Sequence, residues 1–166
     1  MTKIGVLSDT HGLLDPRVLE HFRDVDEIWH AGDIGSFELL QALREFKPTR
    51  AVYGNMDSGD VRYSLSEFYR FRVEEVNVLL THIGGYPGRY NPWLIPMFRK
   101  EPPDLFVCGH SHILKVMYDQ QFHFLTMNPG AAGKQGWQTV QTLLRFTING
   151  KQIEDLEVVE LGKNML

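Results

Sequence analysis

Residues 3–12, Lys-Ile-Gly-Val-Leu-Ser-Asp-Thr-His-Gly, contain the feature that decides the fold of this chain. A short apolar run over Lys3–Ser8 stops at polar residues and a glycine, which is the pattern of a buried strand that ends in a loop. The pair Asp15-Pro16 then supplies an N-cap and a first-turn proline, so it predicts that a helix begins there. The chain therefore opens with a strand, a polar loop and a helix.

The same alternation of strand and helix continues in the next forty residues or so. Glu27–His30 predicts a second short strand, and Arg50–Tyr53 predicts a third. Between them Phe37–Phe46 has helical spacing of apolar residues, with Ser36 as its cap and Pro48 at its end. Strands that alternate with helices form parallel pairs joined by right-handed crossovers. The first half of the chain therefore predicts a parallel sheet.

The second half of the chain has a different pattern. Strands are expected over Phe68–Val73 and Val76–Thr81, and a short helix interrupted by Pro96 is expected over Asn91–Lys100. Further predicted strands are Leu105–Cys108, Lys115–Tyr118, Phe122–Met127, Thr139–Ile148 and Gln152–Leu161. We interpret the last four as consecutive antiparallel strands, with Asn149-Gly150 as a type I′ hairpin turn. The chain thus predicts a mixed α/β sandwich.

Length and composition restrict the class of protein further. The chain has 166 residues, a formal net charge of −4, seven His and one Cys. This length predicts a single domain over residues 1–166. The lone Cys108 excludes a disulfide framework and favours the reducing cytoplasm. No apolar run suits a signal peptide or a membrane span, and the excess of acidic residues argues against a general nucleic-acid-binding surface.

Five polar clusters follow the predicted strands. They are Asp9-x-His11, Gly32-Asp33, Gly54-Asn55, Thr81-His82 and Gly109-His110-Ser111-His112. Sites in α/β sheets form where loops leave the carboxyl ends of strands, so these clusters are expected to converge. The glycines beside the polar residues allow the sharp turns that such loops need. A single His or Asp of this set would more often be an ordinary core or surface residue, but the joint pattern favours a metal site.

The residue types in these clusters indicate two divalent ions. Two carboxylates, one amide and four imidazoles are too many ligands for one tetrahedral ion, whereas a bridging Asp33 would give each of two ions four protein ligands. Carboxylate and imidazole ligands fit Mn²⁺ foremost, with Fe, Zn²⁺ or Ni²⁺ as alternatives, and are too rich in nitrogen for a dedicated Ca²⁺ or Mg²⁺ site. Paired ions can polarise a phosphoryl group and generate hydroxide at neutral pH.

In this order the five clusters resemble the calcineurin-like metallophosphoesterase family, in particular its small bacterial and archaeal phosphodiesterases. The resemblance covers roughly positions 3–148 and implies a four-layer α/β/β/α sandwich of two mixed sheets flanked by helices. It implies one metal on Asp9, His11 and His112, a second on Asn55, His82 and His110, and Asp33 as the bridge. It also implies in-line attack by a metal-bridging hydroxide, with Asn55 stabilising the transition-state oxygens.

One position departs from the family pattern. Most members carry a His directly after the Asn, as the general acid for the leaving oxygen, whereas this chain has Gly54-Asn55-Met56-Asp57. A thioether cannot donate a proton, and general acid catalysis is typically worth about 10²–10⁴-fold. We therefore predict slow turnover of esters with basic leaving groups, and the least loss for good leaving groups such as nitrophenolate. The small bacterial and archaeal subgroup often lacks this His too.

Other residues have less specific interpretations. His30 precedes a ligand loop and is expected to support it rather than bind metal, while His21 and His123 are expected to be structural or surface residues. Cys108 is expected to be a buried apolar residue and not a nucleophile. The loop after His82 holds Tyr86 and Arg89, which could form a substrate wall or belong to an ordinary solvated loop. Asn128-Pro129-Gly130 could lie near the site or be a plain turn.

The hypothesis that follows is a cytoplasmic, binuclear metal-dependent phosphoesterase that acts on small phosphodiesters. The alternative is a scaffold that recruits partners with little or no catalysis, as the retromer subunit of the same fold does. A nuclease for long nucleic acids would need a basic channel, and the chain shows only scattered residues such as Arg62, Arg70 and Arg72. A homo-oligomer remains open, because the C-terminal strands offer an edge for self-association.

Overall fold

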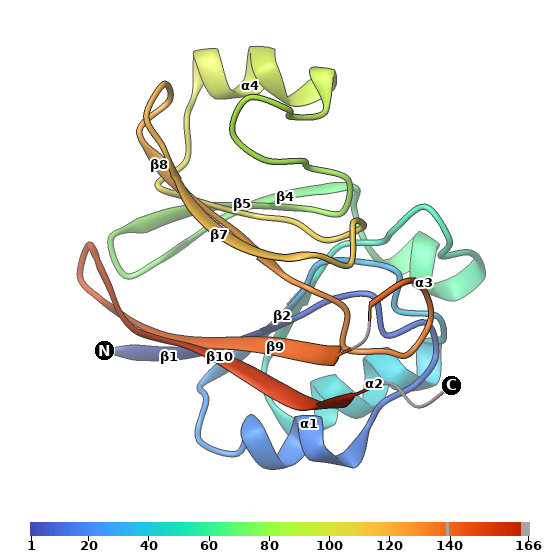
Figure 1. Ribbon diagram of the computed structural model, residues 1–166. Coiled ribbons are helices and arrows are strands. Elements are labelled where there is room, and N and C mark those ends of the chain that lie inside the picture. The colour runs from blue at the N-terminus through green and yellow to red at the C-terminus, as the bar shows by residue number, and fades with distance from the viewer. Residues whose placement is uncertain (139, 164–166) are drawn as a thin grey trace.

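The computed structural model describes residues 1–138 and 140–163, and it contains two five-stranded sheets. The first sheet has the strand order β10-β9-β1-β2-β3 (Figure 1). Its strands are β1 (Thr2–Leu7), β2 (Glu27–His30), β3 (Thr49–Ala51), β9 (Val140–Asn149) and β10 (Gln152–Lys163). β1, β2 and β3 are parallel, as the alternation of strand and helix predicts, while β9 is antiparallel to both β1 and β10.

The second sheet has the order β4-β5-β6-β8-β7. Its strands are β4 (Phe68–Val73), β5 (Val76–Thr81), β6 (Leu105–Val107), β7 (Leu114–Asp119) and β8 (Phe124–Pro129). The three central strands, β5, β6 and β8, are parallel, and the edge strands β4 and β7 are each antiparallel to their neighbour. Both sheets are therefore mixed.

Helices cover the outer faces of the two sheets, which makes four layers (Figure 1). The helices α1 (Pro16–His21), α2 (Phe37–Phe46) and α3 (Gly59–Ser64) lie with the first sheet, and the 3₁₀ turn η1 (Pro92–Leu94) leads into α4 (Ile95–Lys100) on the second. Apolar side chains from both sheets meet between them, among them Trp29 of β2 and Leu80 of β5. The four-layer α/β/β/α sandwich expected from the sequence is confirmed.

Local signals explain how the first helices form. The Asp15 carboxylate accepts a hydrogen bond from the Arg17 amide, and Pro16 occupies the first turn of α1. The Ser36 hydroxyl accepts one from the Leu39 amide and so caps α2. Each cap satisfies an amide that has no partner inside its helix. These caps hold the connections that return the chain to the next parallel strand.

Several local expectations were wrong. The last four strands are not consecutive antiparallel neighbours, because β8 pairs in parallel with β6 while β9 crosses to the first sheet. α3 was not expected, and Pro96 lies in the first turn of α4 instead of breaking a longer helix. Thr139, the first residue of one predicted strand, lies outside the described residues.

The hairpin between β9 and β10 also differs from its prediction. Asn149 still belongs to β9 and pairs with Gln152, so the two loop residues are Gly150 and Lys151. A positive φ occurs at Gly150 (62°) and not at the second loop residue, which fits a type II′ turn better than type I′. The described residues contain no helix that is long and apolar enough to cross a membrane.

Candidate metal centre

The predicted ligands lie at the carboxyl ends of five strands, where the two sheets meet. Asp9 follows β1, Asp33 follows β2 and Asn55 follows β3, all in the first sheet. His82 directly follows β5, and the segment with His110 and His112 follows β6, both in the second sheet. The candidate metal centre therefore joins loops of both sheets, and stacking of the sheets brings residues about a hundred positions apart into contact.

The Asp and His side chains form two clusters. One holds Asp9, His11 and His112, the other holds Asp33, His82 and His110, and in each the ligand atoms lie within 4.8 Å of one another. In the first, His112 Nε2 is 3.3 Å and His11 Nε2 is 3.8 Å from Asp9 Oδ1. In the second, His82 Nε2 lies 3.1 Å from Asp33 Oδ2.

The two clusters share their centre, because the aspartates lie between them. Asp33 Oδ2 is also 3.7 Å from His11 Nε2 of the other cluster, and Asp9 Oδ1 is 3.8 Å from His82 Nε2. Asn55 completes the set of seven, since its Oδ1 lies 3.1 Å from His110 Nδ1. The structure thus brings all seven predicted ligands to one place.

Three polar atoms at this centre are buried and have no hydrogen-bond partner among the described residues. They are Asp9 Oδ1, His11 Nε2 and His82 Nε2. Burial of an unpaired polar atom costs about 1–3 kcal/mol, so such atoms require an explanation. His11 Nε2 and His82 Nε2 each lie 3.8 Å from Asp9 Oδ1, and all three atoms are of the kinds that bind metals, so this set of donors suits divalent cations.

Hydrogen bonds turn the imidazoles toward this space. His82 Nδ1 lies 2.7 Å from the Ala31 carbonyl, and His112 Nδ1 lies 2.9 Å from Gln138 Oε1. An oxygen of this kind only accepts, so each Nδ1 donates and each Nε2 carries the lone pair that faces Asp9 or Asp33. The tautomers are therefore set for metal binding through Nε2.

Backbone strain is concentrated at the same residues. Eight non-glycine residues in the described part of the chain have positive φ, and five of them are Asp9, His11, Asp33, His110 and His112. The left-handed region is costly for residues with a Cβ, and such conformations cluster at functional sites. The sharp loops aim the side chains of successive ligands at one point.

The glycines beside the ligands are needed less for sharp turns than for the close contact of their backbone with neighbouring side chains. A Cβ on Gly54 would lie 2.2 Å from Asp33 Oδ1, and a Cβ on Gly109 would lie 2.1 Å from Ser8 Oγ. Neither residue has a positive φ, so the expected need for a sharp turn is wrong at these two positions, and the space for the ligand carboxylates is what requires glycine. At Gly32 both reasons apply, because φ is 100° and a Cβ would lie 2.7 Å from the His82 ring.

The charge environment keeps the two aspartates ionised. Burial alone would raise the pKa of Asp9, but the nearby imidazoles of His112 and His82 hold the pKa below its usual value. The same balance of burial against His82 lowers the pKa of Asp33. Burial alone would lower the pKa of His82, but Asp33 and Asp9 raise it, and Asp9 raises the pKa of His112. Burial and the nearby His82 lower the pKa of His110. The carboxylates are thus ready to bind a cation at neutral pH.

His30 supports the centre without joining it. The ring is fully buried, Nδ1 accepts from the Gly32 amide, and Nε2 then donates to Thr10 Oγ1, 3.0 Å away. The Thr10 hydroxyl donates to the Ile34 carbonyl, so this chain of bonds joins the Asp9 and Asp33 loops. His30 is in neither cluster, in agreement with its expected supporting position.

The buried state of His30 makes a pH prediction for the metal-free protein. Burial lowers the pKa of His30 to about 4 from an unfolded value of 6.5, so stability falls as the pH drops from 6.5 to 4. We expect the free energy of unfolding to fall by about 3 kcal/mol more in the wild type than in His30→Asn over that range. Urea titrations at several pH values would measure this, and parallel curves for the two proteins would contradict it.

Asp57 is a positioning residue that the sequence interpretation missed. Its buried carboxylate accepts from the amides of Ile34 (3.1 Å), Gly35 (2.9 Å) and Gly54 (2.9 Å), and so ties the loop after β2 to the loop after β3. Its place in Gly54-Asn55-Met56-Asp57, two residues after a candidate ligand, was the available signal.

We expect Asp57→Asn to lower the free energy of unfolding by about 2–4 kcal/mol, because an amide offers one acceptor oxygen where three amides need acceptors. The exposed Asp60→Asn is the matched control and should change the stability by less than about 1 kcal/mol. Chemical denaturation measures both, and equal stabilities would contradict the role of Asp57.

A second missed residue is Gln138, which accepts from His112 and donates through Nε2 to the carbonyls of Gly133 and Gln135. We expect Gln138→Leu to weaken Mn²⁺ binding about 10–100-fold, because the His112 ring loses the partner that orients it. Calorimetric titration of metal-free protein with Mn²⁺ measures this, with Gln120→Leu as a control distant in sequence. An unchanged dissociation constant would exclude this role.

The match to known proteins agrees with this geometry. A model of the calcineurin-like phosphoesterase superfamily domain matches residues 2–151. The chain belongs to this superfamily. The chain is 30% identical over 169 residues to a probable metallophosphoesterase of Methanothermobacter thermautotrophicus, and the match covers 96% of this chain and 92% of the relative.

Solved structures of other proteins share the fold of this chain. An archaeal phosphodiesterase has a TM-score of 0.76 at 22% identity, over 96% of this chain and 99% of that one. Vps29 from Entamoeba histolytica, solved in complex with Zn²⁺, has a TM-score of 0.73 at 17% identity, over 95% and 98% of the two chains. At these identities the likeness is one of fold.

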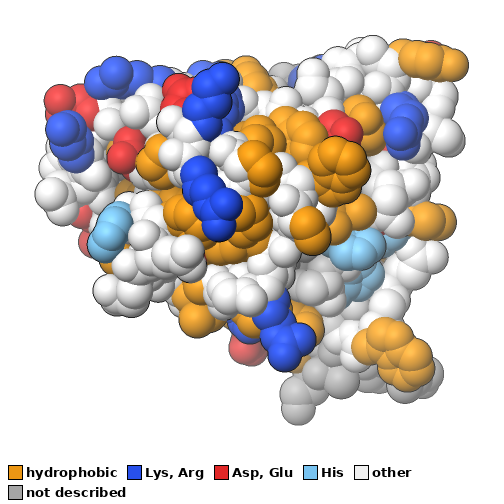
Figure 2. Space-filling view, turned by 90° about the horizontal axis from the view of Figure 1, so that it is seen from above, with side chains coloured by type: hydrophobic (Ala, Val, Ile, Leu, Met, Phe, Trp, Pro, Cys, Tyr) orange, Lys and Arg blue, Asp and Glu red, His pale blue; other side chains and the backbone are white. Residues whose placement is uncertain are grey.

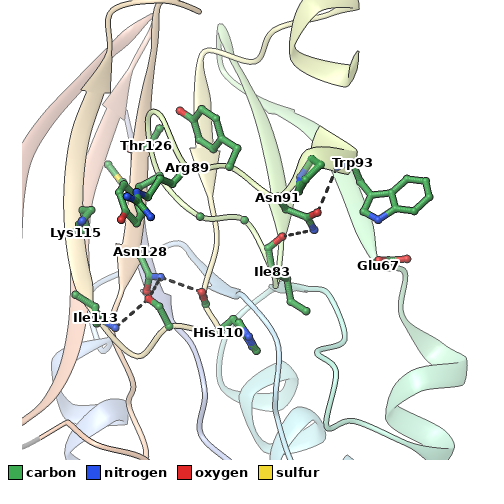
Figure 3. A pocket seen from close by; sticks show the side chains of 18 residues that line it. Glu67, Ile83, Arg89, Asn91, Trp93, His110, Ile113, Lys115, Thr126 and Asn128 are labelled. Carbon is green, nitrogen blue, oxygen red and sulfur yellow. Dashed lines mark hydrogen bonds between the residues drawn. The ribbon is translucent and has the colours of Figure 1, made fainter. Parts of the chain in front are cut away.

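The predicted substrate residues lie beside the centre. Tyr86 and Arg89 line a pocket of about 600 Å³ that also includes His110 (Figure 3).

Met56 is 66% exposed, and its amide donates to Asp33 Oδ1 (2.8 Å). Cys108 is buried, burial raises the pKa of its thiol to about 12, and it is therefore a structural residue as expected. Asn128 also lines the pocket and donates to the Gly109 carbonyl.

Proposed function

We propose that this protein is a phosphodiesterase that uses two divalent metal ions. The observation that carries the proposal is the convergence of three buried, unpartnered ligand atoms, Asp9 Oδ1, His11 Nε2 and His82 Nε2, within a set of seven ligand residues. An unpaired cluster of this kind is costly in a protein without a bound cation. Membership of a family of metal-dependent phosphoesterases supports the same conclusion.

In the proposed site Asp9, His11 and His112 would hold one ion, and Asn55, His82 and His110 would hold the other. Asp33 would be shared by both ions. Ions bound there would polarise a phosphoryl oxygen and lower the pKa of water, which supplies a nucleophile at neutral pH for in-line displacement. We place Mn²⁺ first, with Fe, Zn²⁺ and Ni²⁺ as alternatives, because carboxylate and imidazole ligands suit these ions. The Zn²⁺ complex of Vps29 supports that range.

The protein groups position these parts. The amides of Met56 and His110 donate to the distal oxygens Asp33 Oδ1 and Asp9 Oδ2, which leaves one oxygen of each carboxylate for a cation. Asn55 is exposed beside His110, where its amide could reach a phosphoryl oxygen at the metal centre. The side chain of Met56 cannot donate a proton, so the leaving oxygen must depart as an anion or take its proton from water.

The archaeal phosphodiesterase of the same fold favours a diester, and the pocket can take one of the two substituents of a diester. The pocket of about 600 Å³ beside His110 leaves room for an organic substituent next to the phosphorus. An archaeal protein with this fold is a phosphodiesterase. Tyr86 and Arg89, which line the pocket, are the proposed contacts with that substituent.

The test combines metal analysis with hydrolysis. The purified protein should bind two transition-metal ions per chain, lose hydrolysis of bis(4-nitrophenyl) phosphate after chelation and regain it with Mn²⁺. Hydrolysis of 4-nitrophenyl phosphate, a monoester with the same leaving group, should be slower. Protein that neither holds nor regains transition metal and hydrolyses neither ester would refute the proposal.

A further inference from the structure

The pocket beside His110 has a floor and two walls from different elements. Residues of β8 form its floor, the loop between β5 and η1 forms one wall, and β7 forms the other (Figure 3). Of the ligand segments only Gly109, His110 and Ser111 reach it, so the pocket continues the metal centre on one side. A substrate whose phosphorus lies at the metal centre would place one substituent here.

Most of the pocket surface is apolar. The apolar lining includes Ile83 and Tyr86 of the loop, Trp93 of η1, Ile113 directly before β7, and Met127 of β8. In the view of the face that carries α4, hydrophobic side chains are mixed with Lys and Arg, and histidine side chains reach the surface beside them (Figure 2). An apolar wall of isoleucine and aromatic rings suits a flat apolar group.

The loop that forms this wall is held in place. The Asn91 side chain donates to the Ile83 carbonyl (3.1 Å), and the Tyr90 hydroxyl donates to Asp119. A Cβ on Gly84 would lie 2.5 Å from Cys108 Cβ, so the loop lies directly against the end of β6. The pocket is therefore formed before a ligand arrives, which reduces the entropy cost of binding.

Two cationic side chains line the pocket, and neither has an acidic partner. Among residues 1–138 and 140–163, no carboxylate lies within 4 Å of the charged groups of Arg89 or Lys115. The Lys115 ammonium instead lies 3.7 Å from the centre of the Tyr86 ring. The lining carboxylate, Glu67, lies with Trp93 on the side of the view opposite Lys115 (Figure 3).

We propose that this pocket selects phosphodiesters in which one substituent is aromatic and carries a second anionic group. The aromatic part would lie between Tyr86 and Ile113, and the anion would reach Lys115 and Arg89. A cation over an aromatic ring remains available to an anion, because the ring neutralises none of its charge. The inference rests on the proposed function, since the metal centre must hold the phosphorus.

A binding experiment tests the pocket without hydrolysis. Methylphosphonate, phenylphosphonate and (4-carboxyphenyl)phosphonate are titrated into the Mn²⁺-loaded protein by calorimetry. We expect phenylphosphonate to bind about tenfold tighter than methylphosphonate, because its ring is buried in the pocket. We expect (4-carboxyphenyl)phosphonate to bind about fivefold tighter than phenylphosphonate, because its carboxylate meets the two cations. Equal affinities for all three would overturn the inference.

Variants assign the two gains to the two parts of the pocket. Lys115→Gln combined with Arg89→Gln should remove the gain from the carboxylate and leave the difference between methyl and phenyl. Ile113→Ser should reduce the difference between methyl and phenyl, and Lys100→Gln, on α4 outside the pocket lining, should change neither. Equal weakening of all three ligands by the double variant would overturn the assignment of the cations.

The outcomes for the pocket and for the proposed function are separable. If the protein hydrolyses bis(4-nitrophenyl) phosphate but binds the three phosphonates equally, the pocket inference is wrong and the phosphodiesterase proposal stands. If the three phosphonates bind in the expected order of affinity but no ester is hydrolysed, the phosphodiesterase proposal is wrong and the pocket is a metal-dependent site for aromatic phosphonates. Absence of binding by all three phosphonates would overturn the pocket inference.

Discussion

Asp33→Asn should lower kcat for bis(4-nitrophenyl) phosphate by at least about 10³-fold. Asp33 Oδ2 lies 3.1 Å from His82 and 3.7 Å from His11, so it is the carboxylate that both clusters share in the proposed site. Loss of its charge weakens both ions, and metal-ion catalysis supplies several kcal/mol at about 1.4 kcal/mol per tenfold in rate. Steady-state kinetics with saturating Mn²⁺ and metal analysis of the same samples measure the effect.

The fold should survive this change, because an asparagine Oδ1 can still accept from the Met56 amide. Asp24→Asn removes the same charge from an exposed position between α1 and β2, and it should leave both the metal content and the rate unchanged. Full activity and two bound ions in Asp33→Asn would exclude the bridging role.

Met56→His should raise kcat for diesters with alkoxide leaving groups by about 10²-fold. Met56 directly follows Asn55 and is exposed, so an imidazole at this position has room and can donate the proton that a thioether lacks. Nitrophenolate leaves without protonation, and its esters should therefore change by less than about threefold. A plot of log kcat against leaving-group pKa for both proteins measures the difference in slope.

Met56→Gln is the control for this variant, because it is polar but has no titratable proton near neutral pH. It should keep the steep dependence of the wild type on leaving-group pKa. If Met56→His also keeps that dependence, the missing general acid is not what limits turnover, and another group must protonate the leaving oxygen.

The parallel half of the fold was predictable because its signals are local. The caps at Asp15 and Ser36 and the short apolar runs before Asp9 and Asp33 each depend on neighbouring residues. The placement of β8 and β9 in different sheets was not predictable. Two apolar strands in succession have the same sequence pattern whether they pair with each other or with distant partners. The short helix α3 was missed because it has only six residues and begins at Gly59, so it carries little helical periodicity.

The candidate site, like the fold, has a part that could be predicted from the sequence and a part that could not. The order of Asp, His and Asn residues after strand ends indicated a shared location, and the structure brings those seven residues together. Their supporting contacts were not predictable, since Asp57 and Gln138 act through amides and imidazoles of other loops. Lys115 was also missed, because a single lysine on an amphipathic strand carries no signal of a pocket.

The sequence by itself determined the family, the ligand types and the absence of a histidine after Asn55, because these depend on residue identity and order. Only the tertiary structure decided that glycines beside the ligands make room for carboxylates, that Asp9 and Asp33 lie between two imidazole clusters, and that a basic and aromatic pocket adjoins His110. The physical reason is that each of these features depends on contacts between loops that are distant in the sequence, and only the packing of the strands and sheets sets the distances between those loops.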